Sequence, residues 1–268
     1  MTTTFQTVTS ADGTSIAFEQ VGDGPAVILV GGLVDRTENM PLAQELAEHF
    51  TVYIYDQRGR GDSGDTQPYD VRREIEDLGA VMALAGGSAH VYGASAGGAL
   101  GLEAAAAGLA IDRLAVYEVS YGITDEPEQW RQYISALETL IADGRRGDAF
   151  ALFMRTAGSP EHDIESARQS PVWPSLEAVA HTLVYGAACL GDGQPPRERL
   201  AQITCPTLVL TGTELDPHMS ELPPCVFQRT AAAIAEAVPA ARLQILVGQN
   251  HMVEAKVLAP ALDSFFRS

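Results

Sequence analysis

One serine, Ser95, stands between glycines in a stretch that reads VYGASAGGAL from Val91 to Leu100. The preceding HVYG has the pattern of a strand and the following ALGLEAAAA that of a helix, so Ser95 lies at a strand-to-helix turn. Gly93 and Gly97 relieve the crowding at such a sharp turn, and backbone strain holds the hydroxyl clear of the surface. The helix also directs its positive amino end at the serine. We predict that Ser95 is a nucleophile; the alternative is a serine in a closely packed glycine turn.

A nucleophilic serine needs a general base, and six histidines are available. His251 follows the strand-like LQILV in the segment Gly248–His251 and comes just before the last predicted helix. Because the carboxyl ends of parallel strands meet at one edge of a sheet, this loop should lie at the same edge as Ser95. As a neutral imidazole, His251 would take the proton of Ser95 and return it to the leaving group. His251 is therefore the predicted base.

Acyl transfer also needs backbone N–H donors for the oxyanion that develops on the substrate. Ala96, the residue after the nucleophile, supplies one donor. The turn after the strand-like AVILV reads Gly31-Gly32-Leu33, and glycines there let the backbone approach a ligand closely. We expect Gly32, Leu33 and Ala96 to form the oxyanion hole, although the glycine pair alone would also suit an ordinary loop.

The elements that must position these residues alternate between strands and helices along most of the chain. Strand-like segments are Ser15–Val21, Ala26–Val30, Val52–Asp56, His90–Gly93, Leu114–Glu118, Thr207–Thr211 and Leu243–Val247. Helix-like segments between them are Glu38–His49, Val71–Leu84, Ala96–Ala107, Val226–Ala237 and Val257–Phe266. Several strands are apolar on both faces, as in a parallel sheet covered by helices on each side. The pattern predicts an α/β fold with a doubly wound sheet that starts with an antiparallel N-terminal hairpin.

The alternation stops between Tyr121 and Thr204, where helix-like segments are separated by turns such as GSPEHD and GDGQPP. We expect residues 121–204 to form a helical cap over the carboxyl edge of the sheet, and residues 1–120 and 205–268 to form the core. Trp173, Met154 and Tyr185 of this insertion are candidates to line a pocket for a hydrophobic substrate. The alternative is that they pack only the cap's own small core.

Composition narrows the function classes. The 268 residues are 46% hydrophobic and carry a net charge of −18, which argues against nucleic acid or an anionic membrane as a partner. The polar N-terminus lacks the layout of a signal peptide, and no apolar run approaches the length of a membrane span. Cys189, Cys205 and Cys225 lack C-x-x-C spacing and indicate a reducing cytoplasm. Lys256 is the single lysine, so Schiff-base chemistry is disfavoured, and we expect neither a cofactor nor a metal.

These motifs resemble those of the α/β-hydrolase superfamily, and the likeness spans nearly the whole chain outside the insertion. It includes the GASAG turn, the Gly31–Leu33 loop, the segment Asp56–Ser63 (DQRGRGDS), the strand PTLVLTG and the His251 loop. The family usually has His-Gly where this chain has two glycines, a departure that leaves the backbone donors intact. The resemblance implies a mostly parallel eight-stranded sheet with a helical cap after the sixth strand. It also implies that Asp56–Ser63 is structural and not catalytic.

The acid that orients His251 has two candidates. Family members most often place an Asp three residues beyond a Gly after the seventh strand, but Leu215 occupies that position here, next to Asp216. Asp216 precedes a proline and also suits a turn. Haloalkane dehalogenases and zearalenone-type lactonases instead carry the acid at the tip of the sixth strand, where this chain has Glu118. A carboxylate in that apolar strand needs a partner, and an imidazolium would serve, so we favour Glu118 and keep Asp216 as the alternative.

A serine nucleophile with a histidine base predicts acyl transfer through an acyl-enzyme, and therefore an ester, thioester or lactone hydrolase. Dehalogenases and epoxide hydrolases of this superfamily use an Asp where this chain has Ser95. Glu118 and the segment Pro171–Trp173 are similar to zearalenone-type lactonases, which favours a hydrophobic ester or lactone. The alternatives are a perhydrolase or haloperoxidase, a carbon–carbon bond hydrolase, and a ligand-binding receptor on the same scaffold. A homodimer is left open.

Overall fold

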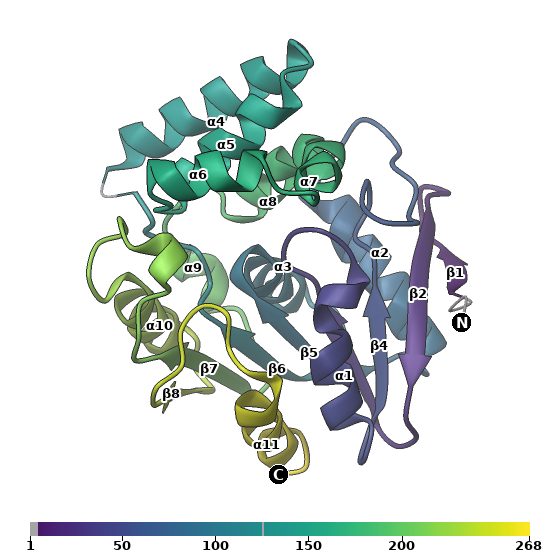
Figure 1. The fold of residues 1–268 in the computed structure, drawn as a ribbon. Coiled ribbons are helices and arrows are strands. Elements are labelled where there is room, and N and C mark those ends of the chain that lie inside the picture. Colours follow the sequence, from purple (N-terminus) through teal and green to yellow (C-terminus); the bar gives the residue numbers. More distant parts are fainter. Residues whose placement is uncertain (1–4, 125) are drawn as a thin grey trace.

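A single mixed sheet forms the centre of the computed structural model, which describes residues 5–124 and 126–268. The first four residues of the predicted core and residue 125 of the predicted cap lie outside the described residues. The strands are β1 (Gln6–Thr9), β2 (Ser15–Val21), β3 (Ala26–Val30), β4 (Thr51–Tyr55), β5 (Ala89–Ala94), β6 (Ile111–Tyr117), β7 (Thr207–Gly212) and β8 (Ala241–Leu246). Their order is β1-β2-β4-β3-β5-β6-β7-β8 (Figure 1).

Only the β1–β2 and β2–β4 pairs of this sheet are antiparallel. The pairs from β4–β3 to β7–β8 are all parallel. This confirms the predicted α/β fold: a doubly wound, mostly parallel eight-stranded sheet that begins with an antiparallel hairpin. The carboxyl ends of β3, β5, β6, β7 and β8 therefore meet at one edge, where the predicted functional residues stand.

The central strands are apolar throughout because their successive side chains enter two different cores. In β3, Ile28 and Val30 belong to the core on one face, whereas Val27 and Leu29 belong to the core on the other. Helices α2 (Val71–Leu84), α3 (Ser95–Ala106) and α10 (Val226–Ala237) cover the first face, and α1 (Met40–Leu46) and α11 (Ala255–Phe266) cover the second. Both faces of the sheet are thus removed from water, which explains the unbroken AVILV pattern.

The expected helix over Glu38–His49 starts later than the sequence pattern predicts. A 3-10 turn, η1 (Arg36–Asn39), comes first, and the α-helix α1 begins at Met40. Pro41 is the second residue of α1, and proline is well placed in the first turn of a helix because its missing N–H has no partner there anyway. The side chain of Glu38 is therefore part of the loop before α1.

The segment between β6 and β7 is helical in its described part. It contains α4 (Pro127–Ala142), α5 (Arg146–Thr156), α6 (Glu161–Arg168), α7 (Trp173–Val179), the 3-10 turn η2 (Ala180–Thr182), α8 (Leu183–Cys189) and α9 (Arg197–Leu200). Figure 1 shows α4 to α8 together at the top, above α2 and α3; these helices with η2 are called the cap below. In the ranges described, no helix is long and apolar enough to cross a membrane.

The cap is fastened to the turn that follows β4 and to the start of α3. The hydroxyl of Tyr185 donates to Asp65 Oδ2 at 2.9 Å, and its ring stacks on Tyr69 with a centroid distance of 3.8 Å. A Cβ added to Gly186 would lie 3.5 Å from the Cβ of Ala96, so α8 rests directly on the first turn of α3. The cap therefore packs over the turn that carries Ser95.

A second contact between cap and core joins cap helix α6 to the loop after β7. His218 Nδ1 lies 3.0 Å from Asp163 Oδ2, and the hydrogen bond that the imidazole donates to this carboxylate raises the pKa of His218 above its ordinary value of 6.5. The carboxylate of Asp163 also lies 3.3 Å from His162 Nε2. This contact between cap and core thus depends on the charge of His218, which changes with pH.

We predict that Asp163→Asn returns the pKa of His218 toward 6.5. Because the folded-state pKa is raised, the charged pair stabilises the fold fully below the unfolded-state pKa and stops doing so as the pH rises through the folded-state pKa. An NMR titration of the histidine ring protons measures this shift. The ring signals of His49, whose Nδ1 lies 2.7 Å from Asp263, are the spectral control, because the substitution does not touch this contact. A His218 pKa that is equal in both proteins would contradict the prediction.

Candidate active site

Ser95 lies at the junction of β5 and α3 in a backbone conformation that side chains rarely adopt. Its φ is +54°, in the left-handed region. Among the described residues other than glycine, only Glu118 and Cys225 share a positive φ. Such a conformation costs about 1–3 kcal/mol, so it persists only where the surrounding packing holds it. The sharp turn predicted from GASAG is therefore present, with the strain that this turn implies.

Glycines make the packing around this turn close enough to hold it. A Cβ on Gly97 would lie 2.5 Å from the carbonyl oxygen of Gly31, so the first turn of α3 touches the loop after β3. Among residues 5–124 and 126–268, no side chain caps the start of α3. The first N–H groups of a helix have no partner within it, so the N–H of Ala96 is an open donor beside Ser95.

Glu118, at the end of β6, holds its carboxylate in a fully bonded buried position. The residue is 2% exposed and has a φ of +41°. Oε2 lies 3.0 Å from His251 Nδ1, while Oε1 accepts from the Gly212 N–H at 2.8 Å and from the Thr211 hydroxyl at 3.2 Å. These partners remove the cost of burying an unpaired charge. With Nδ1 engaged by the carboxylate, Nε2 is the ring nitrogen of His251 that is left to accept a proton.

Asp216, the alternative acid, makes a different contact. Its Oδ1 accepts from the N–H of His218 at 2.8 Å and caps the short 3-10 turn η3 (Pro217–Met219). The hydrogen bonds found in the described ranges do not join Asp216 to His251. The structure therefore brings Glu118 and not Asp216 to the imidazole, and Asp216 has the local turn contact that its position before a proline suggested.

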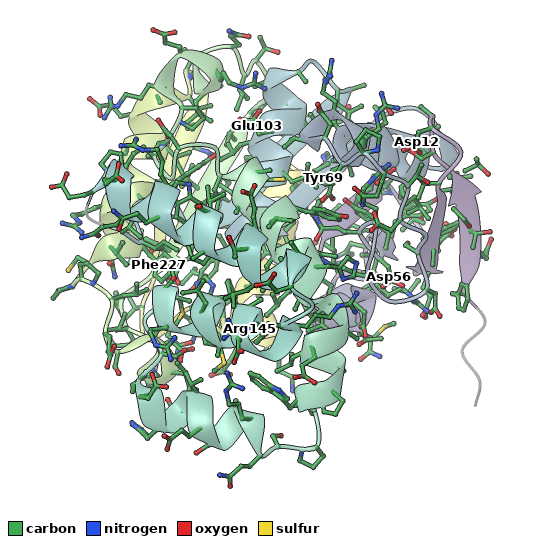
Figure 2. All side chains as sticks on the ribbon, turned by 90° about the horizontal axis from the view of Figure 1, so that it is seen from above. Asp12, Asp56, Tyr69, Glu103, Arg145 and Phe227 are labelled. Carbon is green, nitrogen blue, oxygen red and sulfur yellow. The ribbon has the colours of Figure 1, made fainter. Side chains whose placement is uncertain are left out.

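The loop that carries His251 is fixed from several sides. The ring stacks on Phe227 of α10 with a centroid distance of 4.7 Å, and the Tyr117 hydroxyl donates to the carbonyl of Asn250 at 2.5 Å. The Glu214 N–H donates to the carbonyl of Gln249 at 2.9 Å, which joins this loop to the one after β7. Figure 2 looks down onto the cap, with Phe227 on the side away from strands β1 and β2. The imidazole is thus held in one orientation.

The hydroxyl of Ser95 is bonded to a residue that the sequence analysis did not single out. Its Oγ lies 2.7 Å from the Oγ of Ser120, and over the described ranges no hydrogen bond joins Ser95 to His251. Ser120 follows Glu118 by two residues at the same strand end, which is the one sequence signal that could have found it. Hydrogen bonds between catalytic groups often tighten only when substrate binds, so this geometry is compatible with a serine that turns toward the histidine.

The loop Gly32–Val34 already binds a carboxylate of the chain. Both oxygens of Glu38 are engaged: the N–H groups of Gly32 and Leu33 donate to Oε2 at 3.3 and 3.2 Å, and that of Val34 donates to Oε1. Of the predicted oxyanion donors, Ala96 is therefore open, whereas Gly32 and Leu33 are occupied. Sequence reasoning missed this contact because it placed Glu38 in a helix.

The predicted pocket residues lie mainly in packing positions. Trp173 is buried against the ring of Phe150 at a centroid distance of 5.7 Å, and the guanidinium of Arg168 lies 5.3 Å from its ring. Met154 is partly buried against the main core, and Tyr185 fastens the cap to the turn after β4. The arrangement of Trp173 and Tyr185 favours the alternative in which these side chains build the cap. Their contact with a substrate stays a prediction.

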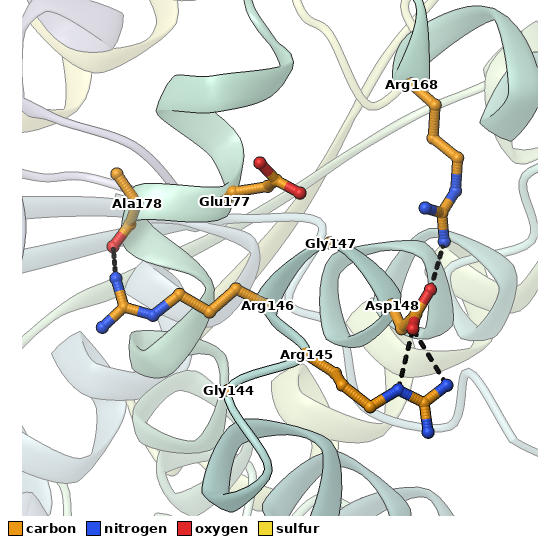
Figure 3. Close-up of a pocket in the computed structure, with 8 residues that line it drawn as sticks. All are labelled: Gly144, Arg145, Arg146, Gly147, Asp148, Arg168, Glu177 and Ala178. Carbon is orange, nitrogen blue, oxygen red and sulfur yellow. Dashed lines mark hydrogen bonds and ion pairs between the residues drawn. The ribbon is translucent and has the colours of Figure 1, made fainter.

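A cavity of about 450 Å³ opens in the cap between α5 and α7 (Figure 3). Most of the polar groups that line it bond to one another: Arg145 and Arg168 donate to Asp148, and Arg146 donates to the carbonyl of Ala178. The lining contains none of the predicted site residues. Within the described ranges, no group of His, Cys, Asp or Glu side chains is arranged to hold a metal ion.

Comparison with known proteins gives a consistent family assignment. The model of the alpha/beta hydrolase family matches residues 27–259. The crystal structure of an alpha/beta hydrolase from Sphaerobacter thermophilus is 48% identical, with a TM-score of 0.86 over 97% of this chain and 100% of that chain. A putative carbamate hydrolase from Cronobacter turicensis is 28% identical over 85% of this chain and 84% of its own length. A thermophilic esterase from Thermogutta terrifontis (23% identity, TM-score 0.72, 99% and 98% covered) shares the fold.

We predict that Gly97→Ala lowers the free energy of unfolding by about 1–3 kcal/mol, because the new methyl group would lie 2.5 Å from the backbone carbonyl oxygen of Gly31 and the backbone would have to shift. The displaced loop after β3 should also reduce any activity of the protein. Gly101→Ala in the same helix is the matched control: its Cβ would lie 3.2 Å from the end of the flexible Leu114 side chain. Urea denaturation of both variants measures the difference. Equal stability of the two variants would show that the contact at Gly97 is not close.

Proposed function

The chain belongs to the alpha/beta hydrolase family, and on that premise we propose that it is a cofactor-free serine hydrolase that cleaves a carboxylic ester or lactone of a hydrophobic small molecule. Ser95 is the proposed nucleophile, His251 the base and Glu118 the acid. The observation that carries the proposal is the 3.0 Å contact of the buried Glu118 carboxylate with His251 Nδ1, at the sheet edge where the strained Ser95 also lies.

In the proposed reaction, Ser95 Oγ turns from Ser120 toward Nε2 of His251 and attacks the acyl carbon while the imidazole takes its proton. Glu118 stabilises the imidazolium that forms and keeps the proton on Nδ1. The imidazolium then gives its proton to the leaving alcohol as the acyl-enzyme forms. Water, deprotonated by the same His251, attacks the acyl-enzyme, and the imidazolium returns this proton to Ser95 Oγ as the acid product is released.

The oxyanion would be bound by the N–H of Ala96 and by that of Leu33 or Gly32. The amides of the Gly32–Val34 loop converge on an anionic group in this structure, which supports their use for an oxyanion. Glu38 must leave them before substrate can take its place. Its side chain is exposed and has room to turn into solvent.

The ester or lactone class is supported by the serine chemistry and by the occurrence of an esterase with this fold. The perhydrolase, carbon–carbon hydrolase and receptor alternatives use the same scaffold, and no separate contact in the site favours them. The cytoplasmic location, the absence of nucleic acid and membrane partners and the homodimer left open by the sequence stay predictions.

We predict that a fluorophosphonate probe labels the wild-type protein and not Ser95→Ala. Glu118→Gln should lower kcat for a p-nitrophenyl ester by about 10⁴-fold, because the neutral amide no longer stabilises the imidazolium. Asp216→Asn should keep kcat within about threefold of wild type, since Asp216 contacts a turn and not the imidazole. Wild-type protein that resists the probe would refute the serine mechanism. A large loss in Asp216→Asn with none in Glu118→Gln would reverse the choice of acid.

We also predict that Glu38→Gln raises kcat/KM by about fivefold, because a neutral acceptor competes about 1 kcal/mol less strongly than a carboxylate for the loop amides. Asp35→Asn is the control, since Asp35 caps the same 3-10 turn through Thr37 and does not contact these amides. Steady-state kinetics on the ester substrate measure kcat/KM of both variants relative to the wild type. A fall in kcat/KM for Glu38→Gln alone would mean that Glu38 supports the loop and does not block it.

A further inference from the structure

Arg60 joins three parts of the molecule that the proposed reaction needs together. The residue is 4% exposed and lies in the turn after β4. Its Nη1 donates to the carbonyl of Gly32 at 3.1 Å and to Gln57 Oε1 at 2.6 Å. Its Nε donates to the hydroxyl of Thr182, in the 3-10 turn η2 of the cap, at 3.0 Å. One side chain therefore bonds the oxyanion loop, the turn after β4 and the cap.

The partners of Arg60 differ from those of its neighbour in the same turn. Arg58 is bound by the carboxylates of Asp77 and Asp12, which is a purely structural ion-pair arrangement. Arg60 makes no ion pair within the described ranges, and its hydrogen-bond acceptors are all neutral. The charge of Arg60 is balanced at one remove by the buried Glu74 carboxylate, because Gln57 donates to Glu74 and accepts from Arg60. What distinguishes Arg60 from Arg58 is that two of its direct hydrogen bonds go to neutral groups outside this turn, in the loop after β3 and in the cap.

The contact with Gly32 sets the direction of a proposed oxyanion donor. In a trans peptide, the carbonyl of one residue and the N–H of the next point in opposite directions within one plane. A guanidinium fixed on the Gly32 carbonyl therefore fixes the direction of the Leu33 N–H, which now donates to Glu38 at 3.2 Å. The positive charge behind the carbonyl also polarises the peptide and strengthens its N–H as a donor.

The cap is closely fitted at the same point. A Cβ on Gly59 would lie 2.9 Å from Thr182 Cγ2 and 3.1 Å from His181 Nε2. The Nε contact of Arg60 with Thr182 can form only while η2 is seated against this turn. The orientation of the guanidinium, and through it that of the Gly32–Leu33 peptide, thus depends on the position of the cap.

We propose that Arg60 is a positioning residue that aims the Leu33 N–H at the substrate oxyanion and, through Thr182, couples this alignment to the seating of the cap. The inference rests on the proposed function, because the oxyanion exists only if Ser95 attacks an acyl carbon. Arg60 acts through the Gly32–Leu33 peptide and touches no reacting atom.

The test compares Arg60→Met, Arg60→Lys and Thr182→Val with wild type in ester hydrolysis and in inhibition by a boronic acid, whose adduct with Ser95 resembles the tetrahedral intermediate. Arg60→Met should lower kcat by about 10- to 100-fold, change KM less than about twofold and weaken boronate binding in proportion to kcat. Arg60→Lys keeps the positive charge but lacks the planar guanidinium, so its kcat should lie between those of Arg60→Met and the wild type. Thr182→Val should lower kcat by about threefold, because it removes one hydrogen bond from the guanidinium.

Thermal unfolding shows whether a variant loses activity because it is less stable. The pH dependence of kcat shows whether the substitution acts on the histidine base. The apparent pKa of the kcat profile should stay at the wild-type value in folded Arg60 variants. If Arg60→Met fails to fold, Arg60→Lys and Thr182→Val supply the comparison. Unchanged kcat in these variants, or a loss confined to KM, would overturn the inference while the wild type still reacts with the fluorophosphonate probe. A wild type that is inert to the probe would instead overturn the proposed function.

Discussion

The buried carboxylate of Glu118 is the interaction on which the arrangement of the site depends. It stands at the end of β6, accepts from the Gly212 N–H and the Thr211 hydroxyl at the end of β7, and contacts His251 on the loop after β8. Three strand ends are therefore tied to one charged group whose side chain is fully buried. Loss of any partner would leave charge or donors unsatisfied, so the position of His251 and the close contact of β6 with β7 are maintained together.

Backbone strain accompanies this arrangement at two points. Ser95 and Glu118 both have positive φ angles, although neither is a glycine, and they occupy the ends of the neighbouring strands β5 and β6. Rigid parallel strands can hold such conformations because each strand is bonded on both sides. Glycines complete the support where the chain passes itself closely, as Gly97 does at the carbonyl of Gly31. The strain is thus located where a hydroxyl and a carboxylate must project from the sheet edge.

The turn after β4 connects this rigid edge to the cap. Arg58 is held by the carboxylates of Asp77 and Asp12, and Asp56 accepts from the backbone N–H of Arg36 at 2.6 Å, so the turn is fixed against the elements around it. Burial raises the pKa of Asp56, and the hydrogen bonds from Asp62 and Arg36 oppose that rise. These contacts hold the shape of the segment Asp56–Ser63; that it takes no catalytic part stays a prediction. Arg60, in the same turn, bonds both the Gly32 carbonyl and Thr182 of the cap.

The sequence by itself determined the alternation of strands and helices, the turn at Ser95 and the loop placement of His251, because each follows from a local pattern and from the rule that parallel strands end at one edge. It left the choice between Glu118 and Asp216 open, since Glu118 and His251 are 133 residues apart and only the folded sheet brings them together. The contact of Ser95 with Ser120 and that of Glu38 with the loop amides were likewise decided by the tertiary structure. Side-chain pairing of this kind depends on the relative placement of strand ends and turns, which residue types and spacing do not specify.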